Sequence, residues 1–143
     1  MQLHFINIKM NKSNKSMKDQ VTEEIKRLCG KVRVLNNGWC LFVHHHLHYL
    51  YIPDETHGMI RISIPHVANS KEYNREVVDV AVNETNKSVK FIKAMMLNNG
   101  SISLNYDHRI SNGDDVGEIV EHIIETLYIA SECLMLNLEK EQN

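Results

Sequence analysis

The length, composition and charge of the chain restrict the kinds of protein that it can be. A sequence of 143 residues is long enough for one domain with one core and too short for a second. Hydrophobic residues make up 43% and charged residues 24%, ordinary globular values that argue against disorder and fibrous repeats. Lys plus Arg (16) nearly balance Asp plus Glu (18), which argues against a general binder of nucleic acids or anionic membranes.

Cysteine spacing and the N-terminal sequence bear on the location of the protein. Cys29, Cys40 and Cys133 are odd in number, far apart and in no metal-binding pattern, so they are predicted to be free thiols. No apolar run approaches the roughly 20 residues of a membrane helix, and the first residues lack the basic start and apolar stretch of an export signal. A cytoplasmic location is therefore expected.

The first predicted elements are an arm and a helix. Residues 1–15 alternate only weakly in hydrophobicity and end in a polar stretch, so they are predicted to form a flexible N-terminal arm. From Ser16 onward the pattern changes, because Ser16 and Asp19 resemble a capping box and apolar residues recur on one helical face. Gly30 stands where a left-handed C-cap is expected. Residues 16–143 are predicted to form a single domain that begins with this helix.

Residues 31–65 are rich in β-branched and aromatic residues and are punctuated by turn residues, so we predict three strands there. The stretch 39–52 is too long for one ordinary strand, and a bend is therefore expected near residues 44–46. Residues 59–65 alternate cleanly between apolar and polar side chains, and Pro65 is expected to end that strand.

A second helix and a hairpin are predicted next. Asn69 offers an N-cap for a helix that runs to about Thr85. Strands at 89–97 and 101–110 follow, and the Asn-Asn-Gly sequence at 98–100 that joins them is a strong hairpin signal. Apolar and polar side chains alternate in the second of these strands, so one face of the sheet is predicted to meet water.

A long helix is predicted at the end of the chain, capped by residues 112–115 and running to about Glu139. Its apolar positions cover more than a narrow stripe, so it needs two packing partners, the sheet and something else. The predicted order is helix, three strands, helix, two strands, helix. This order favours an α+β fold with an antiparallel sheet.

Part of the second helix and the following strand resembles a known family. The sequence Ala-Val-Asn-Glu-Thr-Asn at 81–86 is followed by Val-Lys-Phe-Ile-Lys at 89–93, a hairpin and a long C-terminal helix. These features resemble the YbjN-like domains, a bacterial family of sensory transduction regulators, over roughly residues 17–139. The resemblance implies the fold of type III secretion chaperones, which are small homodimers that bind other proteins without catalysing a reaction.

Asn83, Asn86 and Lys93 are the residues of this family-like motif. Asn83 and Asn86 lie three apart on one helical face, where they either bind a ligand or satisfy backbone groups between helix and strand. The second role is favoured. We therefore predict that the motif is structural and that replacing either Asn by Ala lowers the melting temperature.

Histidines at positions 44, 45, 46 and 48 are the most conspicuous local feature of the sequence. On an unbroken strand His44, His46 and His48 share a face, and neighbours two apart can ligate one metal ion. A bend near residues 44–46 removes this alternation, and the imidazoles then decorate a turn or a solvated face. That interpretation is favoured, so no metal site is predicted, and His44, His46 and His48 remain the candidates if one exists.

Catalytic patterns are not found in the sequence. Cys40 and His44 lie close together, but Cys40 is set in an apolar strand where a buried, inert thiol is expected. Paired carboxylates fall at caps, helix surfaces and turns, and neither a phosphate-binding loop nor a nucleophile motif occurs. We therefore predict no enzyme activity, no catalytic residue and no cofactor.

Two functions are compatible with these features. The favoured hypothesis is a non-enzymatic protein-binding module, chaperone-like or regulatory, that acts as a homodimer. The dimer is suggested by the wide apolar face of the last helix. The alternative is a metal- or pH-responsive sensor that uses the His44–His48 cluster. The expected partners are a second copy and another protein, with no nucleic acid and no membrane.

Overall fold

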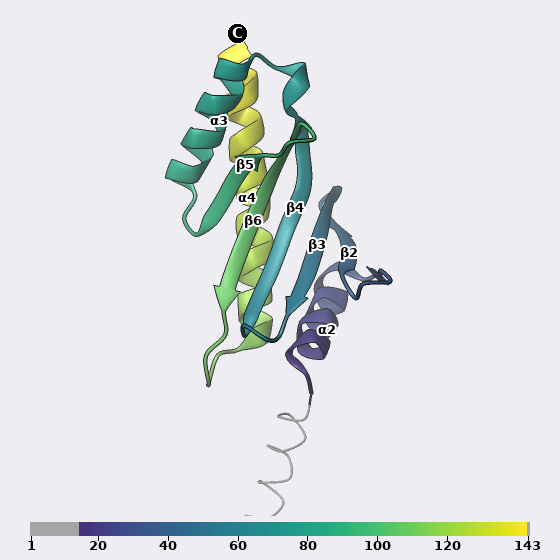
Figure 1. The fold of residues 1–143 in the computed structure, drawn as a ribbon. Helices are drawn as coiled ribbons and strands as arrows, with labels where there is room; N and C mark the ends of the chain where they lie inside the picture. The colour runs from purple at the N-terminus through teal and green to yellow at the C-terminus, as the bar shows by residue number, and fades with distance from the viewer. Residues whose placement is uncertain (1–14, 143) are drawn as a thin grey trace, which may run out of the picture.

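The computed structural model describes residues 15–142, which form three α-helices, a short 3-10 helix and six β-strands (Figure 1). In chain order these elements are α2 (Met17–Cys29), β1 (Val32–Val34), β2 (Cys40–His44), β3 (Leu47–Asp54), β4 (Met59–Asn69), η1 (Ser70–Glu72), α3 (Arg75–Ser88), β5 (Ile92–Met96), β6 (Ser101–Arg109) and α4 (Val116–Gln142).

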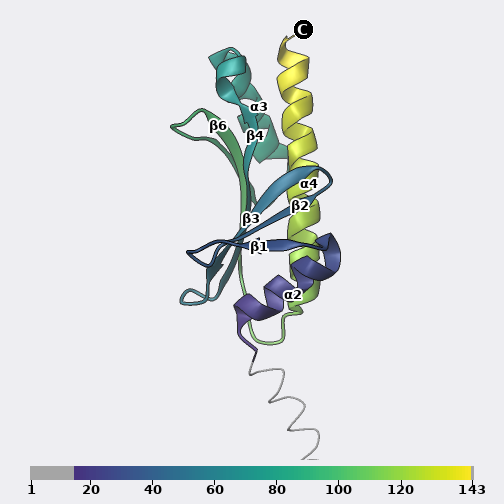
Figure 2. The same cartoon turned by 90° about the vertical axis from the view of Figure 1, so that its right-hand side faces the viewer.

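The six strands form one antiparallel sheet in the order β1-β2-β3-β4-β6-β5. Figure 2 shows the helices on one face of this sheet, with α4 running along it, α2 near one end and α3 near the other. None of the described helices lies on the opposite face. The predicted α+β class with an antiparallel sheet is therefore confirmed.

The core lies between the sheet and α4. The first half of α4 packs against the sheet and α2, for example through Ile123 in the cluster that contains Val21. The second half packs against α3, where Leu134 shares a smaller cluster with Val78. The wide apolar face of α4 thus has the sheet as one partner and the two other helices as the second.

The predicted start and end of α2 and the predicted start of α4 agree with the structure, whereas α4 runs past the expected Glu139 to Gln142. The Ser16 hydroxyl accepts a hydrogen bond from the Asp19 N–H at 3.0 Å, and Gly30 follows α2 with a φ of +91°. At the start of α4, the Asp115 carboxylate accepts a hydrogen bond from the Glu118 N–H at 3.1 Å. Each of these polar side chains satisfies a backbone donor that the first turn of a helix leaves free.

The predicted count of three strands before the second helix is wrong, since four are present. Residues 39–52 contain β2 and most of β3, a hairpin in which His44 pairs with Leu47. His45 and His46 form the turn with φ values of +50° and +66°. A two-residue type I′ turn requires this left-handed conformation, which Asn-Gly usually supplies. The expected bend is therefore a full turn, made by residues that carry little turn signal.

The predicted end of one strand and start of the second helix are also wrong. Strand β4 continues through Pro65 to Asn69, and the pairing register with β6 shifts between Ile64 and Ala68. Such a bulge accommodates a proline, which has no N–H for the ladder. Asn69 caps the short helix η1 by accepting a hydrogen bond from Lys71, and α3 begins only after Asn74.

Two further expectations concern the chain ends and membranes. The predicted flexible arm falls on residues 1–14, outside the described residues, and on Lys15, whose amine forms a 2.9 Å ion pair with Glu23 of α2. Across the described part of the chain, no helix combines the length and the apolar character needed to cross a membrane.

Candidate functional site

The face of the sheet opposite the helices carries the outward-pointing side chains of all six strands, and we call it the open face. Side chains alternate along a strand, so the pairing register determines which residues lie side by side on it. One row crosses the whole sheet from β1 to β5 and consists of Arg33, Leu41, Leu50, Ser63, Asn105 and Lys93. The row has a cation at each end, with apolar and small polar side chains between them.

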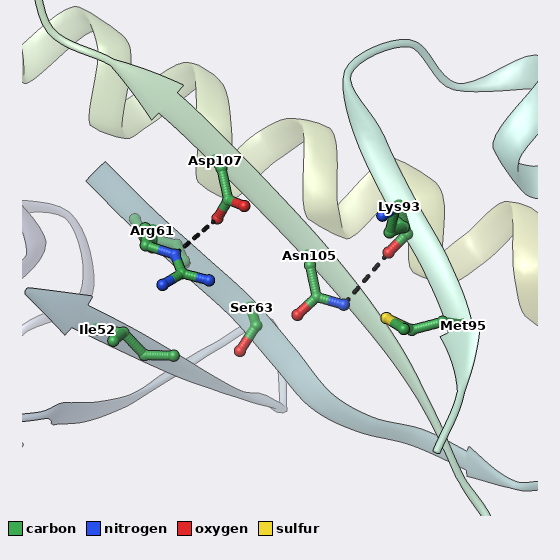
Figure 3. Close-up of a pocket in the computed structure, with 8 residues that line it drawn as sticks. Ile52, Arg61, Ser63, Lys93, Met95, Asn105 and Asp107 are labelled. Atoms are coloured by element: carbon green, nitrogen blue, oxygen red, sulfur yellow. Dashed lines mark hydrogen bonds and ion pairs between the residues drawn. The ribbon is translucent and has the colours of Figure 1, made fainter. Parts of the chain in front are cut away.

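A hollow of about 220 Å³ lies on the open face, over the middle of the sheet (Figure 3). Ser63 and Asn105 are paired across β4 and β6, and Ile52 and Met95 stand on either side of them. Short side chains between longer ones leave the surface recessed. The lining residues are Ile52, Arg61, Ile62, Ser63, Lys93, Met95, Asn105 and Asp107.

The two cations of the hollow differ in their partners. The Arg61 Nε donates to the Asp107 carboxylate at 3.2 Å, and the Arg61 Nη1 lies 3.8 Å from the Asp54 carboxylate. A 2.7 Å hydrogen bond with His57 lowers the pKa of Asp54, so this carboxylate remains an anion beside Arg61. Lys93, by contrast, makes no ion pair with any described residue. Its ammonium group is therefore available to an incoming anion.

The floor of the hollow is polar and partly fixed by hydrogen bonds. The Asn105 amide nitrogen donates to the Lys93 carbonyl at 3.3 Å and to the Ser103 hydroxyl at 3.1 Å. The Asn105 carbonyl oxygen and the hydroxyl of Ser63, a residue that is 6% exposed, are additional polar groups of the hollow. The hollow combines hydrogen-bonding groups with apolar walls, which is the composition typical of binding sites.

The three residues of the family-like motif, Asn83, Asn86 and Lys93, have different surroundings in the structure. The Asn86 amide nitrogen donates to the Ala94 carbonyl at 3.0 Å, and the Asn86 carbonyl oxygen accepts from the Ala94 N–H at 2.7 Å. Asn83 is exposed, and its side chain makes no hydrogen bond within the described residues. Lys93 points from β5 into the hollow on the open face. The three residues therefore do not form one site, and only Asn86 joins the helix to the strand.

The candidate metal ligands His44, His46 and His48 are not brought together. His46 lies in the hairpin turn, and the alternation of β3 places His48 on the open face, whereas His44 faces the helices. His44 is instead close to His45, with ring centroids 4.0 Å apart, and the His45 ring stacks on Tyr128 of α4 at 4.5 Å. Within the described residues, no group of three His, Cys, Asp or Glu side chains is placed to hold a metal ion.

Two tyrosines and a cysteine carry polar groups into the core. Tyr49 and Tyr51 are fully buried, and their hydroxyls make no hydrogen bond with the described residues. Burial raises the pKa of both phenols, so they remain protonated at any physiological pH. Cys40 is also fully buried and donates weakly to the Gly38 carbonyl at 3.7 Å. These groups are enclosed by the core and are not part of the open face.

The hollow is a feature that the sequence does not predict. The alternation of polar and apolar residues in β4 and β6 does indicate a polar outer face for each strand. The hollow arises only because β4 pairs with β6, which brings Ser63 next to Asn105. That pairing joins strands separated by a helix and another strand, and no local pattern encodes it.

Comparisons with known proteins give one structural neighbour. Neither the protein-family models nor the curated proteins contain a match. Among solved structures, the chain is similar to an uncharacterized protein from Methanothermobacter thermautotrophicus, with a TM-score of 0.56 and 11% sequence identity. The match covers 87% of this chain and 98% of that chain. A likeness at this identity shows the fold alone, so the function has to be argued from the site.

Proposed function

We propose that the protein is a non-enzymatic protein-binding module, chaperone-like or regulatory, whose binding surface is the open face of the sheet. The open face itself supports this proposal best. A six-stranded sheet with helices on one side leaves the other side available, and Val43 (48% exposed) and Met95 (40% exposed) add apolar area there. Exposed apolar side chains beside a recessed polar floor favour contact with another protein.

We also propose that the protein is related to the YbjN-like domains, with their type III secretion chaperone-like fold, and that it acts as a homodimer. Most of the wide apolar face of α4, which suggested a dimer from the sequence, packs against α2 and α3 of the same molecule. Among the large apolar side chains of α4, Ile129 (58% exposed) and Leu136 (66% exposed) remain outside the core. They are seven residues apart, on the same side of the helix, and provide a small apolar strip for a second copy.

Recovery of partners from native lysate with matched variants tests the binding surface. Met95→Asp places a charge beside the hollow, and Val80→Asp places the same charge at a similarly exposed position of α3 (41% against 40%), outside the open face and the Ile129–Leu136 strip. We expect Met95→Asp to abolish recovery of the partners that the unmodified protein retains, and Val80→Asp to leave it unchanged. Equal recovery by both variants would show that the open face is not the binding surface. Light scattering at micromolar concentration tests the dimer, and a monomer would refute it.

A sensor that uses the His44–His48 cluster is the second candidate. It is supported by the short distance between the His44 and His45 rings and by the stacking of His45 on Tyr128, which connects the hairpin tip to α4. Two imidazoles this close repel each other when both are protonated, so acid weakens the contact between hairpin and helix.

A further inference from the structure

The charges of the chain are separated between the open face and the last helix. Four cations and two anions stand at outward-facing strand positions, which gives a charge of +2 for a face of a chain with a net charge of −2. They are Arg33, Arg61, Lys93, Arg109, Asp54 and Asp107. The exposed side of α4 carries five glutamates, at positions 118, 121, 125, 132 and 139. The open face is thus the part of the surface that attracts anions.

A second copy is a poor occupant of the open face. Arg33 and Lys93 lie at opposite ends of the same row of side chains. A two-fold axis parallel to the strands places Arg33 of one copy over Lys93 of the other. An axis across the strands places each of these cations over its own counterpart. Both arrangements bring like charges together, so the geometry favours an anionic partner of a different kind.

The size of the hollow suits a side chain of a larger partner. Its volume of about 220 Å³ is below the range of about 300–1,000 Å³ typical of small-molecule sites. Ile52 and Met95 flank it with apolar atoms, and Ser63 and Asn105 provide hydrogen-bonding groups at its floor. An apolar or short polar side chain of a protein segment fits this description.

The spacing between Arg33 and Lys93 defines the length of such a segment. Arg33 and Lys93 lie on the two edge strands of the six-stranded sheet, five inter-strand steps apart. At about 4.8 Å a step they are separated by about 24 Å, which an extended peptide spans with about seven residues. Between them, the carboxylates of Asp54 and Asp107 surround the single cation Arg61, and the remaining negative charge repels a continuous polyanion. Sparse carboxylates therefore match this face better than a nucleic-acid backbone does.

We propose that the open face binds a partner protein through an extended segment of about seven residues that crosses the strands. The segment has a carboxylate near each end, which pairs with Arg33 and Lys93, and apolar side chains between them, of which one enters the hollow. This inference rests on the proposed protein-binding function and specifies the chemistry of its partner.

A peptide array tests the inference with the full-length protein. The peptides have eight residues, with both end positions Glu, Lys or Gln and inner positions drawn from Leu, Val and Ser. We expect the labelled protein to bind the Glu-ended peptides at least about tenfold more strongly than the Lys-ended set, with a difference that shrinks as salt rises. Equal binding to the three sets would overturn the inference.

Variants locate the binding on the open face. Lys93→Gln should weaken binding of a Glu-ended peptide about threefold, and adding Arg33→Gln should weaken it about tenfold in total. Lys26→Gln removes the same charge from an exposed position of α2 and should leave the affinity unchanged. Equal losses in Lys93→Gln and Lys26→Gln would refute the placement, because the effect would then reflect net charge alone.

Two additional measurements separate this inference from its alternatives. Binding of single-stranded oligonucleotides or phosphatidylserine vesicles that is lost in Lys93→Gln would overturn it in favour of a phosphate ligand. If Met95→Asp abolishes partner recovery while the array shows no preference for Glu ends, the proposed function stands and only the acidic-segment inference fails. If Met95→Asp has no effect on recovery, the open face is not the binding surface and both fail.

Discussion

Replacing Asn86 by Ala removes the side chain that holds α3 to strand β5. Both hydrogen bonds between the Asn86 amide and the Ala94 backbone are lost, and because Ala94 is 3% exposed whereas Asn86 is exposed, water replaces them only in part. Each such bond contributes about 0.5–1.5 kcal/mol net, which gives a loss of about 2 kcal/mol. For a chain of this length 1 kcal/mol shifts the melting temperature by about 3 °C, so we expect a fall of about 6 °C.

Asn83 provides the matched control on the same helix. It is exposed and its side chain has no hydrogen-bond partner among the described residues, so Asn83→Ala should change stability by less than about 0.5 kcal/mol. From the sequence we predict that Asn83→Ala and Asn86→Ala each lower the melting temperature; with the structure we expect this only of Asn86→Ala. Asn86→Asp keeps one acceptor for the Ala94 N–H but turns its second oxygen toward the Ala94 carbonyl, and should destabilise at least as much as Ala.

Urea unfolding followed by circular dichroism measures the stability of the three variants, and amide hydrogen exchange reports on the strand directly. We expect the Ala94 N–H to lose protection in Asn86→Ala and to keep it in Asn83→Ala. Equal stability of the two Ala variants, or unchanged protection of Ala94 in Asn86→Ala, would refute the assigned role of Asn86.

Three other changes have defined outcomes. Tyr51→Phe removes a buried hydroxyl that has no partner among residues 15–142, and it should stabilise the protein by about 1 kcal/mol in urea unfolding. A loss of stability would mean that bound water satisfies this group. Burial, assisted by the neighbouring imidazole, lowers the pKa of His44, so the unfolded chain takes up this proton first as the pH falls below about 7. Wild-type protein should therefore lose more stability between pH 7.5 and 5.5 than His44→Gln does, and equal slopes would contradict this. Zinc should not raise the calorimetric melting temperature at pH 7.5 or 5.5, and a rise at pH 7.5 alone that is absent when His44, His46 and His48 are replaced by Gln would favour the sensor.

Local signals predict much of the fold and little of the site. Ser16 and Asp115 cap their helices as expected, since an N-cap depends on a few neighbouring residues. The turn at His45 and His46 is not predicted by the sequence, so one strand too few is expected before the second helix. The left-handed conformation of these residues is held by the pairing of β2 with β3 and by contact with α4. The hollow on the open face, and the row of side chains with Arg33 and Lys93 at its ends, follow from pairings between distant strands. Such pairings are properties of the whole sheet, and a single sequence does not display them.

The contact between Asn86 and Ala94 also limits how the sheet can grow. A sheet extends when a strand of another chain bonds to the free backbone groups of an edge strand. At the β5 edge, the N–H and carbonyl of Ala94 are already occupied by a side chain of the same molecule. Within residues 15–142, no strand pairs with the outer side of β1. A strand that adds at the β5 edge has to displace Asn86, so addition is favoured at the β1 edge, and two copies that join through β1 form a closed pair and not a fibre.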